Sequence, residues 1–266
     1  MNLIVFFTKV YVFCYRKIHK ITDQVTTTPP GSSQNNPLVI IYRISDTGYP
    51  KIKPTYINNE NCLRNAVKRF PVNRCQWLVI ADNICEETYA MICQYIPIDN
   101  IQRVSIGHGA GTFRLAMNTA LTYPDTTIVY FLENDYLHRE HAMEVLLEGF
   151  TLPHCDYVSL YDHPDKYTKT HFVARGGERT NVFLTASSHW KISHSTTMTF
   201  ATRVKTLKQD RHIFRRWTQT SHPFDLEIFI NLDWKGRKLL LPIPGYATHG
   251  DTDGHAPLHN WSTEIE

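Results

Sequence analysis

The sequence predicts a single α/β domain built on a mixed, mostly parallel sheet that is flanked by helices. Short, mostly apolar runs alternate with segments whose apolar residues recur at helical spacing. The chain has 266 residues, 42% of them hydrophobic, which is enough to cover both faces of such a sheet. Polar residues follow the apolar runs directly, where parallel strands place their ligands.

Four apolar runs have strand length, and all but the short one at 101–106 are expected to be buried on both faces of the sheet. They lie at 37–43, 76–81, 101–106 and 127–132. Helical spacing separates them, over 58–70, 86–95 and 113–121, and a glycine-rich turn at 107–112 precedes the third of these helices.

The second half of the chain has a different pattern. Residues 151–200 contain short strand-like pieces and many polar aromatics, and 203–217 and 223–232 have helical character. A strand and then a loop rich in Gly, His and Asp fill 239–261. We expect this half to belong to the same domain, which would then cover 37–266.

The first residues stand apart from this domain. Residues 1–21 are apolar or amphipathic, and 22–36 contain the breakers and small polar residues typical of a linker. The apolar run at 3–17 is interrupted by Lys9 and is shorter than the roughly 20 residues that a membrane-spanning helix needs. We expect a cytoplasmic protein, and peripheral membrane contact through 1–21 stays open.

The charge of the chain bears on its partners, and its cysteine content bears on its compartment. The net charge is only +3 and no run of Lys or Arg forms a stripe, so nucleic acid is not an expected partner. None of the six cysteines forms a CxxC pair, which favours free thiols in a reducing compartment.

The motif Glu133-Asn134-Asp135 directly follows the buried run at 127–132. Two carboxylates spaced i, i+2 at a strand end can reach one hard cation, and Mg²⁺ or Mn²⁺ bound there would bridge a diphosphate. Asp46, Asp82 and the glycine-rich turn follow other expected strands, so these groups should meet at one sheet edge.

The order of apolar strand, acidic motif and aromatic residue resembles the GT-A glycosyltransferases, especially family-2-like enzymes. The blocks that carry the likeness, which are similar to a little-characterised group in microbes and large viruses, lie at 157–167, 187–190, 195–201 and 243–250. The likeness covers about residues 37–261 and implies a donor-nucleotide half, 37–138, and an acceptor half, 139–266.

The resemblance implies roles for particular residues. Metal ligands would be Asp135, Glu133 and His249, with Glu133 in place of the usual Asp, so Asp135 is the expected direct ligand. The donor-binding residues that it implies are Arg43, Asp46, Asp82, Gly109, Gly111, Arg114, Glu133 and Asn134. Each has a plainer alternative, since Asp46 could form a turn, Arg43 could pair with an acid, and the glycines could simply connect a strand to a helix.

The resemblance also implies a general base, an acid on the helix that follows the loop on the acceptor side. Asp225 is the first candidate and Glu227 the second, although both could simply complement the helix dipole. For the sugar or acceptor, the candidates are Asp162, His163 and Trp190, with core packing as the alternative for Trp190.

The sequence thus predicts a divalent-metal-dependent, inverting glycosyltransferase that moves a sugar from a nucleotide diphosphate to a hydroxyl of a glycan, lipid or protein. Two alternatives stay open. One is a carbohydrate-binding protein of the same fold without turnover. The other is a sugar-nucleotide nucleotidyltransferase, which the lack of a Gly-rich basic loop after the first strand disfavours.

Overall fold

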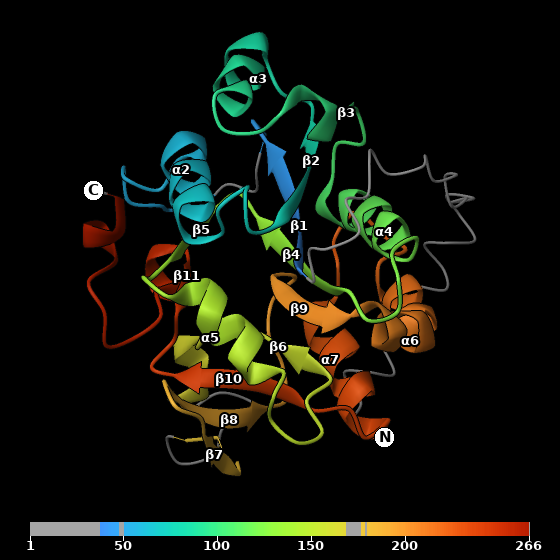
Figure 1. Cartoon of the computed structure of the whole chain (residues 1–266), viewed down its shortest axis with the longest axis vertical. Helices are drawn as coiled ribbons and strands as arrows, with labels where there is room; N and C mark the ends of the chain where they lie inside the picture. Colours follow the sequence, from blue (N-terminus) through green and yellow to red (C-terminus); the bar gives the residue numbers. More distant parts are fainter. Residues whose placement is uncertain (1–37, 48–50, 169–176, 179, 266) are drawn as a thin grey trace.

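The computed structural model describes residues 38–47, 51–168, 177–178 and 180–265. In this part of the chain, nine strands form one sheet in the order β3-β2-β1-β4-β9-β6-β10-β8-β7 (Figure 1). The strands are β1 (Leu38–Ser45), β2 (Gln76–Asp82), β3 (Ile101–Val104), β4 (Ile128–Glu133), β6 (Tyr157–Val158), β7 (Val182–Leu184), β8 (His189–Ser193), β9 (Phe200–Arg203) and β10 (Leu239–Ile243). Because only β8 and β9 run against the others, seven strands share one direction.

Alternate residues of β1 belong to two separate hydrophobic clusters. Leu38, Ile40 and Tyr42 pack on one face of the sheet, whereas Val39 and Ile41 pack on the other. Successive strand residues point to opposite faces, so both faces of this central strand are covered, as the apolar run predicts.

Helices cover both faces of the sheet (Figure 1). The cluster that holds Tyr42 includes residues of α2 (Asn59–Arg69), α3 (Glu86–Cys93) and α5 (Ala142–Gly149). The other cluster includes residues of α4 (Gly109–Ala120), α6 (Val204–Trp217) and α7 (Asp225–Trp234). The predicted α/β class, with a mostly parallel sheet between helices, is confirmed.

A second, two-stranded sheet joins segments far apart in the chain. β5 (Tyr136–His138) and β11 (Ala247–His249) pair antiparallel, with Tyr136 opposite His249, and lie together beside α2 in Figure 1. Short 3₁₀ helices complete the described structure, at Ile98–Asn100, Pro164–Lys166, Thr252–Gly254 and Trp261–Ile265.

Two helices depart from the sequence expectation. α4 begins at Gly109, inside the predicted turn, because the His108 side chain accepts a hydrogen bond from the Gly111 amide and caps the helix there. α5 was not predicted, and the residue before it, His141, has φ +63° and no capping hydrogen bond from its side chain. The usual sequence signal of a helix start is therefore missing at α5.

The predicted segments 1–21 and 22–36 lie outside the described residues. Among those described, no helix has both the length and the apolarity to span a bilayer. The five cysteines of this part of the chain are all unpaired.

Candidate functional site

The acidic motif ends at a cluster of three charged or polar side chains. Asp135 Oδ2 lies 2.8 Å from Lys53 Nζ and 3.2 Å from His249 Nε2. The Asp135 side chain is 16% exposed and that of His249 is 12% exposed, so the cluster still reaches the solvent.

The antiparallel pairing of β5 with β11 brings Asp135 and His249 together. Asp135 immediately precedes β5, and His249 is the last residue of β11, opposite Tyr136. Gly250 follows at a position with no room for a side chain, since a Cβ would lie 2.9 Å from the Asp135 carbonyl oxygen and 2.4 Å from Ile57 Cγ2. A glycine at 250 therefore allows the close approach of the two segments.

The electrostatic balance at Asp135 favours its charged form. Burial alone would raise the pKa of Asp135, but the hydrogen bonds and charges of His249 and Lys53 outweigh it and hold the pKa well below its usual range. The Nδ1 atom of His249 accepts a hydrogen bond of 3.0 Å from the Asp251 amide. In neutral His249 the proton is consequently on Nε2, which faces Asp135.

The first acid of the motif takes a different partner. Glu133 Oε1 lies 3.0 Å from the guanidinium of Arg43, a residue only 5% exposed. Arg43 also donates to the carbonyls of Gly109 and Met198 and lies over the Phe113 ring. Arg43 and Glu133 thus tie β1, β4 and α4 together, and Glu133 is oriented toward Arg43 by this pair.

Asn134, the middle residue of the motif, donates to the carbonyl of Ser45 and to the side-chain oxygen of Asn59. It therefore fastens the motif to the end of β1 and the start of α2.

Two other expected donor-binding acids hold backbone in place. Asp46 accepts from the Cys85 amide at 2.7 Å, from the Thr88 hydroxyl and from Asn59. These bonds lower the pKa of Asp46, although its burial acts in the opposite direction. Asp82 is buried and accepts from the amides of Ile106 and Gly107, which shapes the turn before α4.

The glycine-rich turn contacts Arg43 through a backbone carbonyl. Gly109 accepts from Arg43, and a Cβ on Gly111 would lie 2.4 Å from Ile106 Cγ2, so this position requires glycine. Arg114 donates to the carbonyl of Thr218, at the end of α6.

Asp225 is the first residue of α7 and is partly buried. Burial raises the pKa of Asp225 to about 6, and the negative charges of Glu133 and Glu227 add to the effect, partly offset by the amide of Leu226 and by His163. A carboxylate with a pKa near neutrality suits proton abstraction. Glu227 is buried in the first turn of the same helix.

The three residues expected to contact sugar or acceptor lie in different surroundings. Asp162 is buried, 2.7 Å from Lys191 Nζ. His163 packs against Tyr161, with ring centroids 5.2 Å apart. Trp190 is completely buried, donates to the Thr185 hydroxyl and would clash with a side chain at 149, so it is part of the core.

Two aromatic residues to which the sequence analysis gave no role, Tyr136 and Tyr161, lie next to His249. The ring of His249 contacts those of Tyr136 and Tyr161, at centroid distances of 5.3 and 6.4 Å, and Tyr161 contacts His163 in turn. The charge of His163 lowers the pKa of Asp225. Contacts thus run from Asp135 through His249 and Tyr161 to His163.

Asp135 and His249 suit one divalent cation. Two neighbouring ligands of an octahedral ion with bonds of about 2.1 Å lie roughly 3 Å apart, and Asp135 Oδ2 and His249 Nε2 are separated by 3.2 Å. A carboxylate oxygen suits Mn²⁺. To bind the ion through Nε2, His249 would carry its proton on Nδ1 and would give up the hydrogen bond from the Asp251 amide. In the described residues no group of three or more His, Cys, Asp or Glu side chains could hold a metal, so the remaining ligands would come from substrate and water.

No family model matches this chain, and no sequence among the curated proteins does. Solved structures do resemble it. GalNAc-T7, solved with UDP, GalNAc and Mn²⁺, matches 84% of this chain and 45% of its own, with a TM-score of 0.54 and 12% identity. The chain has the GT-A fold. TarS from S. aureus matches 77% of this chain and 57% of its own, with a TM-score of 0.47 and 13% identity.

A mutant of LgtC gives a TM-score of 0.42 at 11% identity over 73% of this chain and 69% of its own. In this GT-A chain, the Asp135 cluster follows the fourth strand of the sheet, at the edge where β1 and β2 also end. This chain spans less than half of the GalNAc-T7 chain, so the likeness concerns the shared fold.

Proposed function

We propose that this protein is a glycosyltransferase that moves a sugar from a nucleotide diphosphate donor to a hydroxyl acceptor, with a divalent cation held by Asp135 and His249. The pair formed by these two side chains, 3.2 Å apart beyond the end of β4, is the observation that carries the proposal. The presence of UDP and Mn²⁺ with GalNAc-T7, which has the same fold, supports it. The placement among family-2-like enzymes is part of the proposal and rests on the sequence blocks.

A cation bound at this pair would supply positive charge for the diphosphate as the nucleotide departs. The roles of the protein residues follow from their surroundings. Asp135 and His249 would hold the cation at the carboxyl edge of the sheet, and Arg43 with Glu133 would keep β1, β4 and α4 together beside it.

Asp225 would take the proton of the acceptor hydroxyl as that oxygen attacks the anomeric carbon, which gives inversion. Its raised pKa of about 6 leaves most of the carboxyl charged at neutral pH while keeping it basic enough to accept a proton. Glu227 is the second candidate for this role. Asp162 and His163 would position sugar or acceptor, whereas Trp190 supports the core.

The test is to incubate the purified protein with a panel of nucleotide sugars and Mn²⁺ and to measure the released nucleoside diphosphate. We expect release from at least one donor, and a loss of about 100-fold or more in Asp135→Asn. Asp253→Asn, which changes an exposed aspartate of the same C-terminal segment, is the matched control and should retain activity within about twofold.

Other outcomes distinguish the alternatives. Binding of a sugar without turnover of any donor would indicate a carbohydrate-binding protein. Release of pyrophosphate from a nucleoside triphosphate would instead indicate a nucleotidyltransferase.

A further inference from the structure

The residues that lead into α2 cross the loop that follows β11. We call residues 51–54 the entry segment. The Ile52 carbonyl accepts two hydrogen bonds of 3.0 Å from Thr252, from its amide and its hydroxyl. Lys51 Nζ lies 3.6 Å from Asp251 Oδ2, and Lys53 reaches past the loop to Asp135. The entry segment thus lies across the proposed cation site.

The Lys53 ammonium is held less firmly than the backbone that carries it. Within the described part of the chain, Asp135 Oδ2 is its single hydrogen-bonding partner, at 2.8 Å. The Lys53 side chain is 28% exposed. Because Ile52 and Thr252 anchor the entry segment through the backbone, the flexible lysine side chain can leave Asp135 without moving that segment.

Lys53 and a cation would compete for the same atom. Asp135 Oδ2 lies 2.8 Å from Lys53 Nζ and 3.2 Å from His249 Nε2, so a cation held between Oδ2 and Nε2 would use the oxygen that accepts from Lys53. An ammonium at 2.8 Å from this oxygen would lie within a few ångström of the cation, where like charges repel strongly. The two cannot both occupy this position.

We propose that Lys53 is an exchangeable counter-ion of Asp135, which occupies the place of the cation in the cation-free protein and leaves when a divalent ion binds. The affinity for the ion is then set by competition with Lys53. The released ammonium, still tethered at the site, pairs with the phosphates of a nucleotide diphosphate. This second step rests on the proposed function, whereas the exchange itself depends only on the cation.

The experiment measures Mn²⁺ binding to the purified full chain, without nucleotide, from the electron paramagnetic resonance signal of free Mn²⁺. We expect Lys53→Met to bind Mn²⁺ about tenfold more tightly than the natural sequence, because the competing charge is gone. Lys53→Arg, which keeps the charge, should bind no more tightly. Lys51→Met removes a neighbouring lysine that pairs with Asp251, so it controls for net charge and should stay within about twofold.

A second measurement tests the released ammonium. With Mn²⁺ saturating, UDP should bind to Lys53→Met about fivefold more weakly than to the natural sequence, because one phosphate contact is missing. Thermal unfolding of each variant checks that the fold is intact.

Equal or weaker Mn²⁺ binding by Lys53→Met, or no Mn²⁺ binding by any of these proteins, would overturn the exchange. If Lys53→Met binds Mn²⁺ more tightly but no nucleotide sugar is consumed, the exchange holds and the proposed glycosyl transfer fails. If donors are consumed without a divalent ion and Lys53→Met is inactive, glycosyl transfer holds and Lys53 is a permanent counter-charge.

Discussion

Two aspartates of this molecule are each paired with cationic groups, yet they differ in what surrounds them. Asp210 on α6 is completely buried and accepts from Tyr157, Lys235 and Arg237. Asp135 is 16% exposed and accepts from Lys53 and His249. In Figure 1 the α6 and α7 region lies on the opposite side of the view from β5 and β11.

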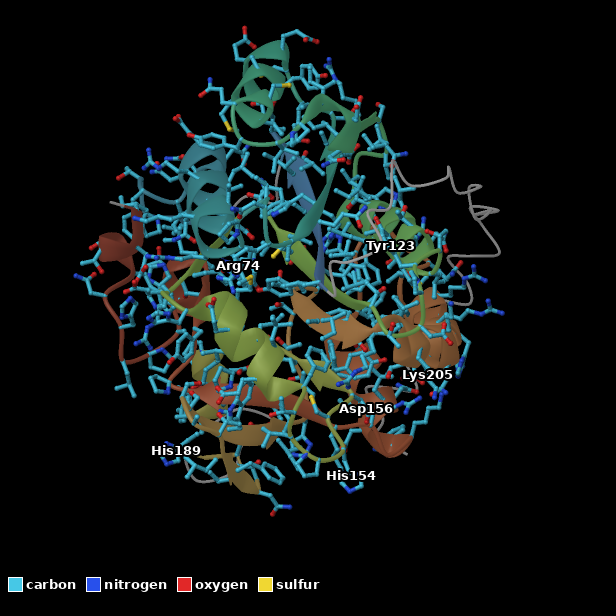
Figure 2. The ribbon with its side chains drawn as sticks, in the orientation of Figure 1. Arg74, Tyr123, His154, Asp156, His189 and Lys205 are labelled. Atoms are coloured by element: carbon cyan, nitrogen blue, oxygen red, sulfur yellow. The ribbon has the colours of Figure 1, made fainter. Side chains whose placement is uncertain are left out.

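The difference separates a fixed ion cluster from an exchangeable one. Arg237 donates to Asp210 through both Nε and Nη2 and also reaches Asp156, so the guanidinium is held in one geometry. Figure 2 shows Asp156 on the α6 side of the molecule. The Asp210 side chain has no exposed surface, whereas that of Asp135 is 16% exposed and can exchange a partner with the solvent.

The largest expected difference is in the free energy of unfolding after each aspartate is replaced by asparagine. Asp210→Asn should lower the free energy of unfolding by about 3 kcal/mol, because the buried charged acceptor shared by Tyr157, Lys235 and Arg237 is lost. Asp135→Asn should lower it by less, about 1–2 kcal/mol, because the charge that Lys53 and His249 stabilise is lost. Urea unfolding measures both, with Lys205→Ala, an exposed α6 residue labelled in Figure 2, as a control expected within about 0.5 kcal/mol. Equal destabilisation by the two aspartate variants would contradict the distinction.

Gly250 lies beside Asp135, and Gly236 lies between the two cationic partners of Asp210. Substitution of each glycine therefore tests the two clusters separately. A Cβ at Gly250 would overlap Ile57 and the Asp135 carbonyl, so Gly250→Ala should cost about 1–3 kcal/mol and also weaken Mn²⁺ binding. Gly236, next to Lys235 and Arg237, has open space but a φ of +88°. Gly236→Ala should cost about 1–2 kcal/mol through backbone strain alone. Unfolding and Mn²⁺ titration of both variants check this, and a loss of Mn²⁺ binding in Gly236→Ala would argue against it.

Asp225 should affect stability with the opposite sign to Asp135, because its charged form destabilises the folded state. Because its pKa is raised from 3.8 to about 6 in the fold, the folded state holds this proton more tightly than the unfolded state. The contribution of Asp225 to stability therefore falls as the pH rises toward and through 6. Asp225→Asn should stabilise the fold, and by about 1 kcal/mol more at pH 7.5 than at pH 5.

The same titration gives the expected pH dependence of activity. Donor turnover with an acceptor should rise as the pH increases through about 6, where Asp225 loses its proton, and should be absent in Asp225→Asn. A rate that is independent of pH between 5 and 7.5, or activity retained by the variant, would remove Asp225 as the base and favour Glu227.

The sequence predicted those parts of the fold whose pattern is local. The apolar runs correspond to β1, β2, β3 and β4, and the helical spacing corresponds to α2, α3, α4, α6 and α7. The two-stranded β5–β11 sheet was not predictable, since each strand has only three residues and its partner is far away in the chain.

Side-chain partners were the least predictable feature of the site. Arg43 stands opposite Glu133 in the register of β1 with β4, and no spacing in the sequence reveals that pairing. The same holds for Lys53, which lies 82 positions from Asp135. For Trp190, stacking on sugar and packing in the core have the same sequence signature, and only its complete burial distinguishes them.

The pairing of β5 with β11 also has a consequence for the order in which the protein is made. Asp135 emerges from the ribosome well before His249, and a chain synthesised from its N-terminus can build β1 to β4 before β11 exists. Until β11 docks, only one of the two side chains of the proposed ion site is present. Mn²⁺ affinity would therefore report that β11 has paired with β5. A nascent chain, or one that lacks β11, is expected to form β1 to β4 without the ion-binding pair.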